Sequence, residues 1–149
     1  MTAIDFRPAT GELYGVSSQS RVYVISQETG NARIVGIASL NPIITGTAVG
    51  LDFDSTVDRV RLVISTGQNL RLHPETGTVV ATDMAINGGT NPKIESVAYT
   101  NNTAGSTTTV LYDIDSQTDK LYKHDPPNNG LLVEVGALGT DIMVSAGFD

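Results

Sequence analysis

Three imperfect copies of one pattern constrain the fold of this chain more than any other feature. An aromatic residue that ends a short apolar stretch recurs at Phe6, Phe53, Tyr99 and Phe148, at spacings of 47, 46 and 49 residues. Internal periods of roughly 40–50 residues, with four short strands in each, are typical of β-propeller blades. The sequence therefore predicts an all-β protein, a β-propeller with three four-stranded antiparallel blades per chain.

The copies divide the chain into a single domain of three blade repeats, at about 3–49, 50–95 and 96–145, with a terminal strand at 146–149. In each copy a polar turn follows the first strand, and a glycine turn precedes the fourth. Glu-Thr-Gly stands at both 28–30 and 75–77, where glycine supplies the positive φ of a tight hairpin. The connections are too short for parallel crossovers, so each unit is an antiparallel meander. In the third copy we expect strands at 109–113, 120–123 and 131–135.

Composition supports this class and excludes several functions. Apolar residues make up 40% of the chain and charged residues only 17%, which suits short strands, and no helix-length apolar stripe is present. The net charge of −7 disfavours nucleic acid partners. Without cysteine, the chain cannot use disulfides or thiolates. No apolar run has membrane-spanning length, so we expect no membrane contact, and Met1 leads straight into a strand without a signal peptide. The cellular location stays open.

Several strings in the chain resemble a bacterial family catalogued as domain of unknown function 4394. The matching stretches are 4–14, 57–61 with 67–72, and 98–102 with 111–115. The resemblance covers nearly the whole chain, and the chain is similar to the middle three repeats of a longer family member. It implies a propeller-like fold, and it carries no activity.

Three blades alone cannot close a ring, because propellers need at least about 4 blades. The first and last copies, which open at Ala3 and close at Phe148, are as apolar as the middle one and have no charged cap. We therefore expect a homodimer that forms one six-bladed ring.

Two aspartates and two histidines have side-chain chemistry that could serve a functional site. Asp5 and Asp52 lie in the middle of apolar strands near the ring axis, so they are candidates for lining a channel; the alternative is pairing with backbone or arginine of the next blade. His73 and His124 end the third strands of their copies at equivalent positions, so we expect them to point away from each other and to have no function.

The connections between blades are the best candidates for binding a small molecule, whose identity the sequence leaves unknown. They are polar and glycine-rich, and loops of this kind gather on one face of a propeller. The candidate residues there are Asn41, Thr45, Asn87, Thr90, Asn91 and Asp141. The alternative is that these loops only bridge the blades.

No cofactor is expected, although calcium is possible. Asp113, Asp115 and Asp119 have a spacing that can surround calcium, and the alternative is a hairpin turn in which these side chains bond their own backbone. The favoured function is a propeller-type binding or scaffold module without evident catalytic machinery. A calcium-dependent propeller hydrolase is the alternative, as is an engineered or excised half-propeller without its own activity.

Overall fold

The chain folds into three four-stranded antiparallel sheets in the computed structural model, which describes residues 1–47, 49–142 and 147–149. Sheet I contains β1 (Ala3–Phe6), β2 (Leu13–Val16), β3 (Val22–Ile25) and β4 (Ala32–Val35). Sheet II contains β5 (Val49–Asp54), β6 (Arg59–Ile64), β7 (Asn69–His73) and β8 (Thr78–Thr82). Sheet III contains β9 (Ile94–Tyr99), β10 (Leu111–Asp115), β11 (Lys120–His124) and β12 (Leu132–Ala137). The predicted all-β class is confirmed.

Helical structure in the described residues is limited to η1 (Pro127–Asn129), a single 3₁₀ turn between β11 and β12. No helix in this part of the chain is long and apolar enough to cross a membrane. The two Glu-Thr-Gly turns adopt the predicted geometry, since Gly30 has φ of 73° and Gly77 has φ of 61°. The local turn chemistry therefore agrees with the strand order.

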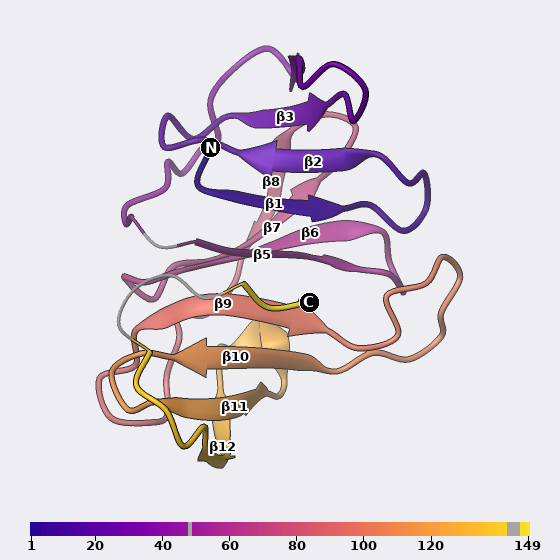
Figure 1. The fold of residues 1–149 in the computed structure, drawn as a ribbon. Coiled ribbons are helices and arrows are strands. Elements are labelled where there is room, and N and C mark those ends of the chain that lie inside the picture. Colours follow the sequence, from indigo (N-terminus) through magenta and orange to yellow (C-terminus); the bar gives the residue numbers. More distant parts are fainter. Residues whose placement is uncertain (48, 143–146) are drawn as a thin grey trace.

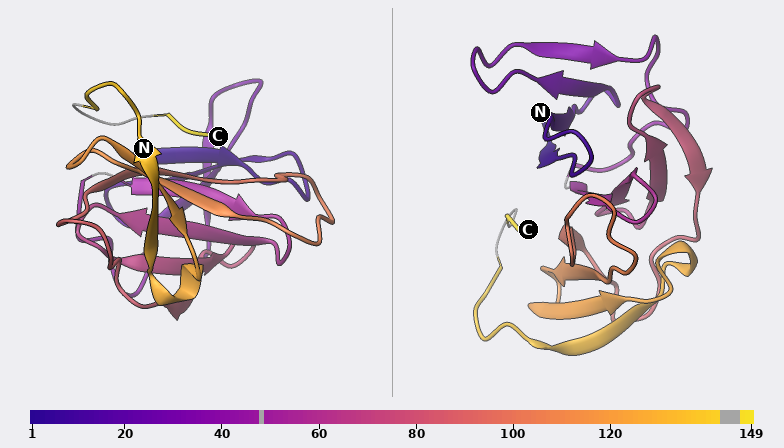
Figure 2. Two further views of the ribbon diagram at one scale, coloured as in Figure 1. Left: turned by 90° about the horizontal axis from the view of Figure 1, so that it is seen from below. Right: turned by 90° about the vertical axis from the view of Figure 1, so that its right-hand side faces the viewer.

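The sheets stand side by side in an arc, with their first strands on its inner side (Figures 1 and 2). β1 lies beside β5, and β5 lies beside β9. Sheet II is thus covered on both faces, which explains why β6 is buried nearly throughout instead of alternating. Each end sheet has one covered face and one open face.

One apolar core fills the junction between sheets I and II. Val16 and Val22 from sheet I pack there with Leu62 and Leu70 from sheet II, and all four are almost fully buried. The ring of Tyr14 meets that of Phe53 edge-on, with centroids 5.3 Å apart and an interplanar angle of 76°. Apolar burial and this aromatic contact hold the two sheets together.

The junction between sheets II and III combines a second apolar cluster with a close backbone approach. Val63 of β6 packs there against Val97 and Tyr99 of β9. β5 carries Gly50 at this point, and a Cβ at that position would lie 2.9 Å from the Val97 backbone nitrogen. A glycine is therefore required for β5 and β9 to come this close.

A buried polar network crosses the same junction. Arg61 of β6 donates to Asp83 at 2.6 Å, to Asn128 at 2.7 Å and to the Tyr99 hydroxyl at 3.2 Å. Arg71 binds the same Asp83 carboxylate through two hydrogen bonds, at 2.8 and 2.9 Å. Asn128 lies in η1, between β11 and β12, so this network ties sheet II to the outer part of sheet III.

The open face of sheet I is apolar. By register, Ile4 and Phe6 of β1 correspond to Leu51 and Phe53 of β5. The β5 pair is 7% and 0% exposed against sheet I, whereas Ile4 and Phe6 are 56% and 49% exposed. At the other end of the arc, Val133 of β12 is likewise exposed. Both end faces thus present side chains of the kind that other sheets bury.

Strand boundaries in sheet III differ from the sequence prediction. β10 is Leu111–Asp115, two residues later than predicted, because Thr100 pairs with Val110 and extends the preceding loop. Asp113 and Asp115 therefore lie in a strand, and the predicted turn covers only the residues after them. The predicted terminal strand begins at 146, outside the described residues; residues 147–149 are not part of a strand.

Candidate functional site

Asp5 and Asp52, the candidates for lining a channel, both accept hydrogen bonds from the neighbouring sheet. Asp5 Oδ2 accepts a hydrogen bond from the Phe53 amide at 3.2 Å, and its Oδ1 accepts from the Phe6 amide at 2.7 Å. Asp52 repeats this arrangement one sheet further along, since its Oδ2 accepts from the Tyr99 amide and its Oδ1 from the Phe53 amide at 2.5 Å. These hydrogen bonds agree with the alternative interpretation, in which each aspartate pairs with the backbone of the next blade instead of lining a channel.

The two carboxyl groups also contact each other. Burial, and after it the neighbouring Asp5 carboxyl, raise the pKa of Asp52 to about 8. Burial likewise raises the pKa of Asp5, while the neighbouring Asp52 opposes that rise. At neutral pH the protonated form of Asp52 is therefore favoured.

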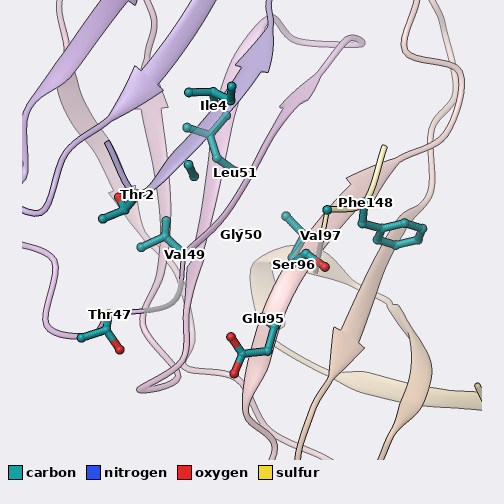
Figure 3. A pocket seen from close by; sticks show the side chains of 12 residues that line it. Thr2, Ile4, Thr47, Val49, Gly50, Leu51, Glu95, Ser96, Val97 and Phe148 are labelled. Atoms are coloured by element: carbon teal, nitrogen blue, oxygen red, sulfur yellow. The ribbon is translucent and has the colours of Figure 1, made fainter. Parts of the chain in front are cut away.

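A cavity of about 250 Å³ lies between the inner strands, and neither aspartate lines it. Figure 3 shows Thr47, Val49 and Leu51 on one side and Glu95, Ser96 and Val97 on the other. The Glu95 carboxylate is already engaged, by Lys93 Nζ at 2.9 Å and by the Ser116 hydroxyl at 2.9 Å. The rest of the wall mixes apolar side chains with Thr2, Thr47 and Ser96.

The loop candidates are all exposed, and two of them hold neighbouring loops. These candidates are Asn41, Thr45, Asn87, Thr90, Asn91 and Asp141. Thr45 contacts the Thr66 hydroxyl at 2.9 Å, in the turn between β6 and β7. Asn87 donates to the Asn129 carbonyl at 2.7 Å and pairs with Leu131 beside sheet III. These two positions support the alternative that the connections bridge the sheets.

The aspartates considered for calcium have separate roles. Asp115 accepts from the Lys93 amide at 2.7 Å and from the Thr118 hydroxyl at 2.6 Å, which shapes the β10–β11 turn. Asp119 accepts from the Ile142 amide at 2.8 Å. Asp113 faces His124 instead. Within the described ranges, no group of three or more His, Asp or Glu side chains could hold a metal ion.

The two histidines are not equivalent. In sheet III, His124 pairs with Leu111 of β10, which in turn pairs with Tyr99. In sheet II the residue at the position of His124 is Leu72, which pairs with Val60. His73 therefore lies one residue beyond the position equivalent to His124. His124 is completely buried, and His73 is half-buried.

His124 and Asp113 form a buried pair that sequence reasoning did not bring together. His124 Nδ1 lies 3.0 Å from Asp113 Oδ2, and both side chains are fully buried. Burial raises the pKa of Asp113, which the neighbouring imidazole partly offsets. The signal in the sequence was weak, because it required aligning the third copy by strand register and noticing polar residues where the second has leucines.

Comparison with known proteins gives one result. A family model described as "Domain of unknown function (DUF4394)" matches residues 1–149. No curated protein matches the chain.

Proposed function

Because this chain belongs to the DUF4394 family, a domain family of unknown function, we propose its function from its own geometry: it is half of a β-propeller. Two copies close a six-bladed ring, and the ring serves as a binding module. The observation that carries this proposal is the open face at each end of the arc, where Ile4 and Phe6 of sheet I and Val133 of sheet III are exposed.

The two internal junctions supply the packing rule for the ring. At each junction, one sheet contributes the face on which its inner-strand aspartate lies, which is Asp5 in sheet I and Asp52 in sheet II. The next sheet contributes its opposite face. Sheet III presents the first kind of face, where Ala98, Tyr112, Lys123 and Val133 share one side by register. Sheet I presents the second kind, with Ile4 and Phe6. A second copy therefore offers each open face the partner that it has inside the chain.

The energetics favour closure. Exposed apolar patches of more than a few hundred Å² are uncommon on soluble monomers and mark interaction sites. Two identical junctions around a two-fold axis would bury both patches, and at roughly 25 cal/mol per Å² this burial outweighs the cost of association. Two-fold dimers are also the most common closed assemblies.

The junction between two chains lacks one hydrogen bond that both junctions within the chain have. Ala98 occupies the position of Asp5 and Asp52, so it cannot accept the amide hydrogen bond from the next aromatic residue. The ring therefore relies on apolar packing where two chains meet, and its opening is easiest there.

A charge placed on the open face of sheet I tests the proposal. We expect Ile4→Glu to halve the particle mass, because the carboxylate would be buried at the junction between chains. Val57→Glu is the matched control, since Val57 is equally exposed but lies in the β5–β6 turn, away from the end faces. Size-exclusion chromatography with light scattering gives the mass. A wild-type protein that runs as a monomer, like Ile4→Glu, would refute the ring.

A further inference from the structure

An arginine of the chain fills one end of the junction between sheets I and II. Arg7 directly follows β1, and its side chain is only 7% exposed. Its Nε donates to Asp58 Oδ1 at 2.9 Å, its Nη2 donates to Oδ2 of the same carboxylate, and Nη2 lies 3.3 Å from Glu75 Oε1. Such bidentate pairing gives a guanidinium its strongest contact with a carboxylate. This junction therefore contains a guanidinium site that the chain itself occupies.

The equivalent place between sheets II and III has no arginine. When the sheets are aligned by the registers of their inner strands, Asp54 takes the position of Arg7, and Thr109 takes that of Asp58. An acid on sheet II and a hydroxyl on sheet III thus stand where the other junction has a guanidinium and its carboxylate. The space of the arginine side chain is left to be filled from elsewhere.

A cavity of about 410 Å³ lies at this place. Its volume is within the range typical of sites for small molecules, roughly 300–1,000 Å³. The imidazole of His124 adjoins it but is completely buried, so it offers no atom to a ligand. The polar side chains at the wall that a ligand can use are those of Asp54, Thr107, Thr108, Thr109, Lys123 and Asp125.

The charges at this wall favour a cation. Lys123 and Asp125 form an ion pair at 2.6 Å. Arg71 lies close enough to sense the charge of Asp54, but it already binds Asp83 through two hydrogen bonds. Asp54 belongs to none of the ion pairs in the part of the chain that the structure describes. One carboxylate is therefore left without a counter-charge, which attracts a cation and repels an anion.

We propose that this cavity, which we call the Asp54 cavity, binds the guanidinium group of an arginine, either the free amino acid or an arginine side chain in a peptide. The guanidinium forms a bidentate pair with the Asp54 carboxylate and donates to the hydroxyl oxygens of Thr108 and Thr109. It takes the place that Arg7 fills in the other junction. This inference rests on the proposed role as a binding module and gives it a ligand class. The cavity is built within one chain, so it does not need the ring.

Calorimetric titration with matched ligands tests the proposal. L-arginine and the peptide acetyl-Gly-Arg-Gly-amide carry the guanidinium, L-citrulline is its neutral isostere, and L-lysine has the charge without the planar fork. We expect at least one arginine ligand to bind saturably, at least about tenfold more tightly than citrulline or lysine. Tighter binding of L-arginine assigns the cavity to the free amino acid, and tighter binding of the peptide assigns it to a protein segment. No binding of either arginine ligand, or equal binding of citrulline or lysine, would overturn the proposal.

Removing the unpaired charge tests the role of Asp54. Asp54→Asn keeps an oxygen for the two hydrogen bonds that Oδ1 accepts within its turn, so the protein should stay folded. Affinity for the arginine ligand should fall at least about tenfold. Glu28→Gln is the matched control, because it removes the same charge from an exposed turn of sheet I and should leave the affinity nearly unchanged. Equal affinities in the two variants would refute the assignment.

A second variant fills the cavity from within the chain. Asp54→Arg combined with Thr109→Asp rebuilds the pair that Arg7 and Asp58 form in the other junction, so a folded double variant should no longer bind arginine. Binding that persists would place the ligand elsewhere and overturn the proposal. Light scattering on the same samples separates this inference from the ring. A monomer that binds arginine refutes only the ring, and a dimer that binds neither arginine ligand refutes only the ligand class.

Discussion

Asp5 of β1 accepts a hydrogen bond from the backbone amide of Phe53 in β5, at 3.2 Å. The same relationship recurs between Asp52 and Tyr99, so two acids on neighbouring inner strands fasten the three sheets to one another. Since burial and the neighbouring Asp5 carboxyl raise the pKa of Asp52 to about 8, this fastening depends on pH.

Asp52→Asn should remove much of that pH dependence. The pKa of Asp52 is raised from 3.8 to about 8 in the folded protein, so the folded state keeps a proton that the unfolded state releases. The wild-type free energy of unfolding should therefore be highest below about pH 4 with respect to this group and fall as pH rises towards 8. Asparagine keeps one acceptor oxygen, for the Tyr99 amide, and does not ionise, although its NH₂ group cannot accept from the Phe53 amide as Asp52 does.

Between pH 5 and pH 8 we expect wild type to lose about 1–3 kcal/mol of stability relative to the Asp52→Asn variant. Urea unfolding between pH 5 and pH 8 measures this difference. Parallel pH profiles for wild type and variant would show that Asp52 is already ionised in the folded protein.

Asp83→Ala should destabilise the protein strongly. Asp83 is buried and accepts from both Arg61 and Arg71, and the Arg61 side chain is only 3% exposed. Removing the carboxylate leaves a buried guanidinium without its counter-charge, which costs about 3–5 kcal/mol. Thermal unfolding with Lys120→Ala as control measures the effect, because the Lys120–Glu134 pair is at the surface and its loss should leave the melting temperature nearly unchanged. Equal melting temperatures for the two variants would argue against a structural role for the network.

Gly77→Ala should cost more stability than Gly30→Ala. Both glycines have positive φ, which costs an alanine about 1 kcal/mol. At Gly77 a Cβ would also lie 2.6 Å from the Val35 carbonyl oxygen of sheet I, whereas nothing lies within 4 Å at Gly30. Chemical denaturation should therefore rank the variants as wild type, Gly30→Ala, Gly77→Ala; a reversed order would mean that the two end-of-sheet turns are packed differently.

The sequence predicts the sheets well because their information is local. Period, turn glycines and short apolar stretches decide where strands begin, and the turn at Gly30 needs nothing from distant residues. The site depends on register and on contacts between sheets, which local patterns do not contain. The registers of β6–β7 and β10–β11 place His73 one residue beyond the position of His124, which the strand ends alone did not reveal, and Asn128, one partner of Arg61, lies in η1.

The buried pair of Asp113 and His124 was also beyond local reasoning. Asp113 and His124 belong to different strands, and the predicted boundaries placed Asp113 at a strand end before a turn rather than inside β10. The predicted loops, such as the one with Thr45, were chosen for polarity, and polarity alone does not separate a ligand site from a connection that holds two sheets together.

The particle mass in solution tests the central claim, the six-bladed ring, most directly. Light scattering at micromolar concentration should give about 31 kDa, twice the chain mass of 15.7 kDa. The melting temperature should rise with protein concentration, because dissociation and unfolding are coupled in such a dimer. A monodisperse, folded particle of 15.7 kDa with a concentration-independent melting temperature would contradict the account.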